Sequence, residues 1–167
     1  MKNSHFIIIA SLLVSLFIYL FYRTEKTVIN EIFIQLVTYS KYSTLKTAVR
    51  TSLPLNELVI YSLPEGLWIF CITLTSKHFY IQPGKPFIKC VFFPLIYSIG
   101  LEIFQLFHLV NGRFDFMDIW VSLAFWLLGL HIFNDTMAVE NIFKNLNTKK
   151  LVCIGSYGLV YLSHVMI

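Results

Sequence analysis

The chain has 167 residues, of which 57% are hydrophobic and only 13% are charged, and its formal net charge is +4. A soluble domain of this size has too much surface to bury so much apolar side chain, and globular proteins carry about 25% charged residues. The composition therefore excludes an ordinary soluble domain and predicts a membrane protein. The modest positive charge gives no support for a nucleic-acid partner.

Five apolar runs are each close to the length of about 20 residues that a membrane-spanning helix needs. They cover residues 5–22, 58–75, 87–109, 116–133 and 151–167. The first run is too long for the core of a signal peptide and no small-residue cleavage site follows it, so we expect a retained anchor. The sequence thus predicts an all-α fold: a polytopic membrane bundle of about five transmembrane helices in a single domain, residues 1–167.

The connection between the first two runs contains an amphipathic segment at residues 27–39. Its apolar residues form one helical stripe, and Asn30, Glu31 and Gln35 fall on the other face. Such a helix lies on the membrane surface or packs back on the bundle, or else it prolongs the first helix as a tilted stalk. Residues 41–54 are rich in Ser, Thr and basic residues. We expect a solvated loop there, with contact to lipid headgroups as the alternative.

The basic residues predict an orientation. Those on the N-terminal side of the five runs lie mostly in two short loops, whereas those on the other side lie mainly in the long connection. The positive-inside rule gives most weight to short loops next to spans. We therefore expect the N-terminus in the cytoplasm and the C-terminus outside.

Two glutamates lie inside the apolar runs, where an ionised carboxylate costs about 2.5–3.5 kcal/mol on insertion scales. Glu65 lies eight residues after Glu57, and Glu102 lies eight residues before Val110. A helix rise of about 1.5 Å per residue places each about 12 Å from the end of its span. Because both ends are on the same side of the membrane, we expect the two glutamates to lie at one level.

More polar side chains cluster around this level. Gln105 lies one turn from Glu102 on the same helix face, and two more acids and an arginine follow in and after the next turn. The pattern predicts a polar pocket that opens on the side of that turn. Its expected binding residues are Glu65, Glu102, Gln105, Arg113, Asp115, Asp118 and Ser122. The alternative is that Arg113 and the Gln and Ser side chains only neutralise the acids and join the helices.

The second run is interrupted by Pro64-Glu65-Gly66. Proline removes a helix hydrogen bond and glycine adds flexibility, so we expect a kink at the level of the acids. Freed carbonyls at membrane depth are tolerated where they face protein or a water-filled cavity. The kink therefore supports a polar site at this level.

Other chemistry has little support. His108 beside the acids offers metal-ligand atoms, but no HExxH or comparable spacing exists, so we expect no metal site and no cofactor. No P-loop, GxSxG or Cys/His nucleophile pattern is present, so the sequence shows no recognisable nucleophile. The single cysteines Cys71, Cys90 and Cys153 form no CxxC pair, and we expect them to be small buried hydrophobic side chains.

The run Glu102-x-x-Gln105-x-Phe107, then Gly112-Arg113-Phe114-Asp115-x-x-Asp118, and later Gly129, resembles the VanZ-like family of small bacterial membrane proteins. The likeness covers residues 97–133, and with the block at 62–68 it defines a VanZ-like core at 58–133. The resemblance implies a protein of the bacterial inner membrane that belongs to the cell envelope. The family's name-giving members are associated with low-level resistance to teicoplanin-type glycopeptides.

Three functions remain open. The first is a non-enzymatic envelope protein whose outward-facing pocket binds a lipid headgroup, a lipid-linked cell-wall precursor or a glycopeptide-type compound. Arg113 would then meet a phosphate or carboxylate, and the acids would meet amine or hydroxyl groups. The second is a membrane enzyme acting on a lipid-linked substrate, with Glu102 or Asp118 as general base. The third is an accessory subunit that binds other membrane proteins. The lack of a nucleophile or metal motif favours the first.

Overall fold

The computed structural model describes residues 2–23, 28–110, 113–132, 139–144 and 147–164. This part of the chain is predominantly helical, which confirms the all-α class. The helices are α1 (Lys2–Tyr22), α2 (Val28–Val37), α3 (Tyr39–Ser52), α4 (Glu57–Ser76), α5 (Phe93–Leu106), α6 (Phe116–His131) and α7 (Thr148–His164). Residues 27, 133 and 165–167 of the predicted segments, and Gly112, lie outside the described residues.

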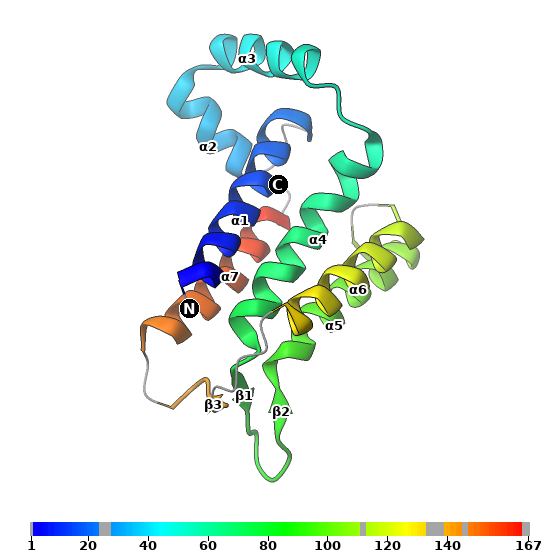
Figure 1. Cartoon of the computed structure of the whole chain (residues 1–167). Helices are drawn as coiled ribbons and strands as arrows, with labels where there is room; N and C mark the ends of the chain where they lie inside the picture. Colours follow the sequence, from blue (N-terminus) through cyan, green and yellow to red (C-terminus); the bar gives the residue numbers. More distant parts are fainter. Residues whose placement is uncertain (1, 24–27, 111–112, 133–138, 145–146, 165–167) are drawn as a thin grey trace.

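Helix α4 is the central element, and α1, α5, α6 and α7 pack around it (Figure 1). Residues 68–74 of α4 are all buried. Apolar side chains cover this helix on all sides, as expected for a helix that is surrounded by others. Helices α2 and α3 lie at one end of the bundle, and a small sheet lies at the other (Figure 1).

Two glycines allow α4 and α6 to approach closely. A Cβ atom on Gly66 of α4 would lie 2.5 Å from Cδ2 of Phe125, and one on Gly129 of α6 would lie 2.9 Å from the side chain of Thr73. Small residues at such contacts let helix backbones pack tightly, which is the main source of helix association in membranes. Helix α4 continues through Pro64, and the kink expected there stays a prediction.

Gly66→Ala is expected to lower the free energy of unfolding by about 1–3 kcal/mol, because its methyl group would overlap the Phe125 ring. The matched control is Gly100→Ala on α5, where a Cβ atom would meet nothing within 4 Å. The control should be neutral or slightly stabilising, since alanine favours helix. Thermal melting of the purified variants distinguishes them, and equal melting temperatures would contradict the close contact.

Helix α3 replaces the loop that was expected at residues 41–54, so that prediction is wrong. The hydroxyls of Thr44, Thr47 and Thr51 each donate to the backbone carbonyl four residues earlier, at 2.9–3.0 Å. Ser and Thr usually disfavour helices because they compete for backbone groups, but here they bond within the helix itself. The Ser/Thr-rich composition therefore does not break the helix.

The inner face of α3 binds the C-terminal end of α1. Lys46 donates to the carbonyl of Arg23 at 3.2 Å, and Arg50 donates to the carbonyls of Phe21 and Tyr22 at 2.8 and 2.7 Å. The hydroxyl of Tyr42 donates to the carbonyl of Leu20 at 2.7 Å. The last carbonyls of a helix have no partner within the helix and carry its negative dipole end. Cationic side chains on α3 satisfy both needs.

Arg50→Ala is expected to lower the free energy of unfolding by about 1 kcal/mol, because it removes a cation and two donors from the C-terminal end of α1. Lys41→Ala is the matched control, since Lys41 is an exposed cation on the same helix. Thermal melting should show a loss in the first variant and little change in the second. A larger loss for Lys41→Ala would show that α3 is held in another way.

Helix α2 is separate from α1 and packs back on the bundle, so the stalk interpretation is wrong. The Phe33 ring contacts Phe21 of α1 and Tyr42 of α3, with centroids 6.5 and 6.0 Å apart. The predicted faces are only partly correct. Asn30 is fully buried, 3.4 Å from the Tyr42 hydroxyl, whereas Leu36 is 78% exposed. The buried hydroxyl of Tyr42 explains why a polar residue faces inward.

The third predicted span is shorter than expected, because its first residues are not α-helical. They form strand β2 (Ile88–Lys89) and a 3₁₀ turn at Cys90–Phe92 before α5 begins. Strand β1 (Phe79–Ile81) pairs antiparallel with β2 and parallel with β3 (Glu140–Asn141). The sheet therefore joins the α4–α5 connection to the segment before α7. The three cysteines are buried, as predicted.

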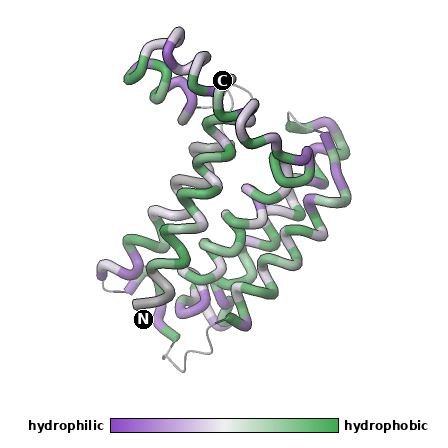
Figure 2. The backbone as a smooth tube through the Cα atoms, turned by 45° about the horizontal axis from the view of Figure 1, so that its top comes forward, coloured by the Kyte–Doolittle hydropathy of each residue, from purple (hydrophilic) through white to green (hydrophobic). Residues whose placement is uncertain are grey.

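By length and composition, α4 is the one described helix that could cross a membrane. Segments Phe6–Tyr22, Cys90–Leu106 and Phe116–His131 are apolar but shorter. Figure 2 shows hydrophobic residues along the length of the bundle helices, and hydrophilic residues mainly in α3 and the segments at the bundle ends. The helical bundle is established, and the five spans stay a prediction.

Candidate functional site

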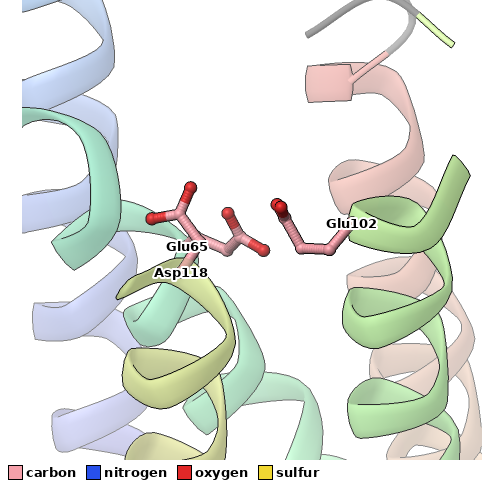
Figure 3. Close-up of side chains that lie close together, drawn as sticks. All are labelled: Glu65, Glu102 and Asp118. Atoms are coloured by element: carbon pink, nitrogen blue, oxygen red, sulfur yellow. The ribbon is translucent and has the colours of Figure 1, made fainter. Parts of the chain in front are cut away.

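Three carboxylates from three helices converge near one end of the bundle. Glu65 lies in α4, Glu102 lies near the end of α5, and Asp118 lies in the first turn of α6. An oxygen atom of each lies within 4.8 Å of an oxygen atom of both others, and the side chains point toward one another (Figure 3). The predicted meeting of Glu65 and Glu102 is therefore confirmed, and Asp118 joins them.

Glu102 is the most deeply buried acid of the three, with 2% of its surface exposed. Its Oε2 accepts a hydrogen bond from the backbone N–H of Asp115 at 3.0 Å. Asp115 is the N-cap residue of α6, and its own carboxylate accepts from the N–H of Met117 at 2.8 Å. Asp115 therefore supports the site through its backbone, while its carboxylate caps the helix.

Two buried serines form the polar base of the site. The Ser98 hydroxyl donates to Oε1 of Glu65 at 3.2 Å and lies 2.8 Å from the Ser122 hydroxyl. Ser122 was expected at this site, but Ser98 was missed. The signal was present, because Ser98 lies four residues before Glu102 and thus on the same face of α5. These serines link α4, α5 and α6 with hydrogen bonds at the level of the acids.

Some buried acceptors at this end of the bundle have no donor. Oδ1 of Asp118 and Oε1 of Gln105 are buried and accept no hydrogen bond from any residue that the structure describes. Buried polar atoms almost always have a partner, and leaving one unpaired costs about 1–3 kcal/mol. Gln105 is half-buried on α5 and has no described hydrogen bond to the three acids. The site therefore has acceptors in excess of donors.

Arg113 does not neutralise the acids, which corrects the expected role of this residue. It is exposed, and within the described ranges no ion pair or hydrogen bond joins it to a carboxylate. An exposed guanidinium keeps its hydration, so the turn gains little by drawing it into an apolar bundle. His108 is likewise exposed, in the left-handed backbone region with φ of 56°.

The cation near the acids is Arg23, which sequence reasoning did not select. Its guanidinium lies 5.1 Å from the ring centroid of Tyr19 and 5.3 Å from that of Tyr61. Nη2 donates to the Tyr61 carbonyl at 2.7 Å. Tyr61 lies four residues, about one helix turn, before Glu65 on α4. Arg23 is also close enough to Glu65 for their charges to interact.

Carboxylate oxygens in this arrangement are chemically suited to amine and hydroxyl donors, and also to hard cations such as Mg²⁺ or Ca²⁺. Glu65, Glu102 and Asp118 offer one oxygen each to such a cation. The expectation of no metal site, made from the lack of a ligand motif, stays a prediction. The geometry limits the chemical class of the ligand but does not identify it. A ligand of these oxygens must donate hydrogen bonds or carry positive charge.

Neither a protein-family model nor a curated protein nor a solved structure matches this chain. The resemblance to the VanZ-like family rests on residues 97–133 and the block at 62–68, and it stays a prediction. The site is therefore interpreted from its own geometry.

Ser98→Ala is expected to lower the free energy of unfolding by about 1–3 kcal/mol, because it leaves the half-buried Glu65 carboxylate without its donor. Arg113→Ala should change it by no more than about 0.5 kcal/mol, since Arg113 is an exposed residue without a described partner. Thermal melting of both variants is the measurement. Severe destabilisation by Arg113→Ala would restore Arg113 as the counter-charge of the acids.

Proposed function

We propose that this chain is a multi-pass protein of the bacterial inner membrane, with its N-terminus in the cytoplasm, and that its carboxylate pocket binds a polar group outside the cytoplasm. The carboxylate pocket consists of Glu65, Glu102, Asp118, Ser98 and Ser122. The ligand in this proposal is a lipid headgroup or a lipid-linked cell-wall precursor. Binding, rather than a reaction, is the proposed activity.

The outward faces of the bundle support the membrane location. Phe6 on α1 is 73% exposed, Trp120 on α6 is 64% exposed and Leu151 on α7 is 62% exposed. Soluble monomers rarely expose such apolar side chains over several helices, whereas lipid chains would surround them at no cost. Helices shorter than the bilayer can be accommodated by local thinning of the membrane.

The excess of acceptors over donors carries the binding proposal. Three carboxylates meet at one point, and a buried oxygen of Asp118 accepts no hydrogen bond from the described residues. A ligand with amine or hydroxyl groups supplies what these oxygens lack, and each hydrogen bond to a charged group contributes about 1.5–3 kcal/mol. Arg113 is exposed and forms no described ion pair with the acids, and its contact with a phosphate stays a prediction. The enzymatic alternative has no further observation in its favour.

The test is native mass spectrometry of the gently solubilised protein. Wild type should carry a bound lipid-sized mass, and Glu102→Gln should retain at least tenfold less, because the neutral amide loses the charge that holds the ligand. Glu57→Gln is the matched control: Glu57 is an exposed acid in the first turn of α4, eight residues before Glu65, and is not a member of the pocket. It should retain the ligand as wild type does.

Two results would contradict this function. One is a bound mass that is unchanged in Glu102→Gln. The other is bare protein in all three samples at equal thermal stability, which would make the acids a purely structural feature of the helix contacts.

A further inference from the structure

Arg23 is held in one position from several directions. Its backbone carbonyl accepts from Lys46 of α3, and its guanidinium contacts the rings of Tyr19 and Tyr61. Nη2 is fixed by the Tyr61 carbonyl at 2.7 Å. Aromatic rings on the guanidinium face leave its edge as the hydrogen-bonding surface, and this edge fits the oxygens of phosphate or carboxylate. Arg23 is thus oriented before any ligand binds.

The donors of Arg23 are only partly used. A guanidinium has five N–H donors, and the described contacts use Nη2 alone. Nε is buried, and no described residue accepts from it. Buried donors without an acceptor are rare in proteins and are costly in a membrane. Arg23 therefore has donor capacity for an anionic group.

Arg23 and the acids are neighbours without being an ion pair. Nη2 of Arg23 donates to the carbonyl of Tyr61, which lies four residues, about one helix turn, before Glu65 on α4. Yet among the described residues no salt bridge of 4.0 Å or less joins Arg23 to an acid. Opposite charges in an apolar bundle would be expected to close on one another. Their separation leaves a cationic side and an acidic side within one site.

We propose that Arg23 is the anion-binding residue of the carboxylate pocket, and that the pocket takes the phospho-amine headgroup of a membrane lipid. The protonated amine meets Glu65, Glu102 and Asp118, and the phosphate meets the guanidinium edge of Arg23. This inference rests on the proposed function and names its ligand class. It also assigns partners to two of the unpaired buried atoms: the amine supplies the donor that Oδ1 of Asp118 lacks, and the phosphate supplies the acceptor that Nε of Arg23 lacks.

The experiment exposes the solubilised full chain to three lipids and measures retention by native mass spectrometry. Phosphatidylethanolamine has both groups, phosphatidylglycerol has the phosphate alone, and a long-chain primary amine has the amine alone. Wild type should retain phosphatidylethanolamine at least tenfold better than either of the others. Equal retention of the long-chain amine and phosphatidylethanolamine would overturn the role of Arg23. This comparison uses the wild-type protein alone, so it does not depend on whether a variant folds.

The variants then separate the two sides of the site. Arg23→Gln should reduce phosphatidylethanolamine retention to the level of the long-chain amine, and Glu65→Gln should reduce it to the level of phosphatidylglycerol. Lys41→Gln removes an exposed cation at the same end of the bundle and should change nothing. Thermal melting of each variant verifies its fold.

Two outcomes distinguish this inference from the function on which it rests. Wild-type retention by Arg23→Gln together with loss in Glu65→Gln would overturn the phosphate role of Arg23 and leave the binding function standing. Wild-type retention by both variants would overturn the inference and the proposed function together.

Discussion

Three carboxylates between apolar helices, Glu102 buried and Glu65 and Asp118 half-buried, place the strongest constraint on this structure. Each must be hydrogen-bonded or neutralised, because a buried charge without a partner is far costlier than any single apolar contact is favourable. The pairing of α4, α5 and α6 follows from this need. Ser98 reaches Glu65 and Ser122, and the N–H that begins α6 reaches Glu102. These hydrogen bonds fix the axial position of each helix relative to its neighbours, which apolar packing alone does not fix.

The close approach of α4 and α6 is a second condition for the site. Gly66 directly follows Glu65, and its missing side chain leaves room for Phe125 and Val121 of α6. This contact sets the separation of the two helix axes and thereby brings Asp118 to Glu65. Gly129 repeats the arrangement further along, against Thr73. A polar site and a small-residue helix contact therefore depend on one another in this bundle.

Helix α3 connects the end of the bundle to the site. Its cationic side chains occupy the last carbonyls of α1, and Arg23 is the residue at that end whose side chain turns toward Tyr61 of α4. The position of Arg23 thus depends on α3, although none of the three acids lies in that helix. A second polar cluster joins α4 to α7, where Ser76 contacts the hydroxyl of Tyr157 at 3.0 Å. That cluster is satisfied by its own members and stabilises the helix contact.

The sequence by itself determined the helical class and the convergence of Glu65, Glu102 and Asp118. Apolar composition and run length are local properties, and a constant helix rise converts residue spacing into depth. The tertiary structure decided which cation approaches the acids. Arg113 is nearest in sequence yet exposed, whereas Arg23 bonds to a carbonyl 38 residues away. Helix α3 and the sheet also depend on contacts between segments far apart in the sequence. Lys46 and Arg50 of α3 donate to carbonyls at the end of α1, and strand β1 pairs with β3. The local sequence does not identify these contacts, because they stabilise the protein only after folding has brought the distant segments together.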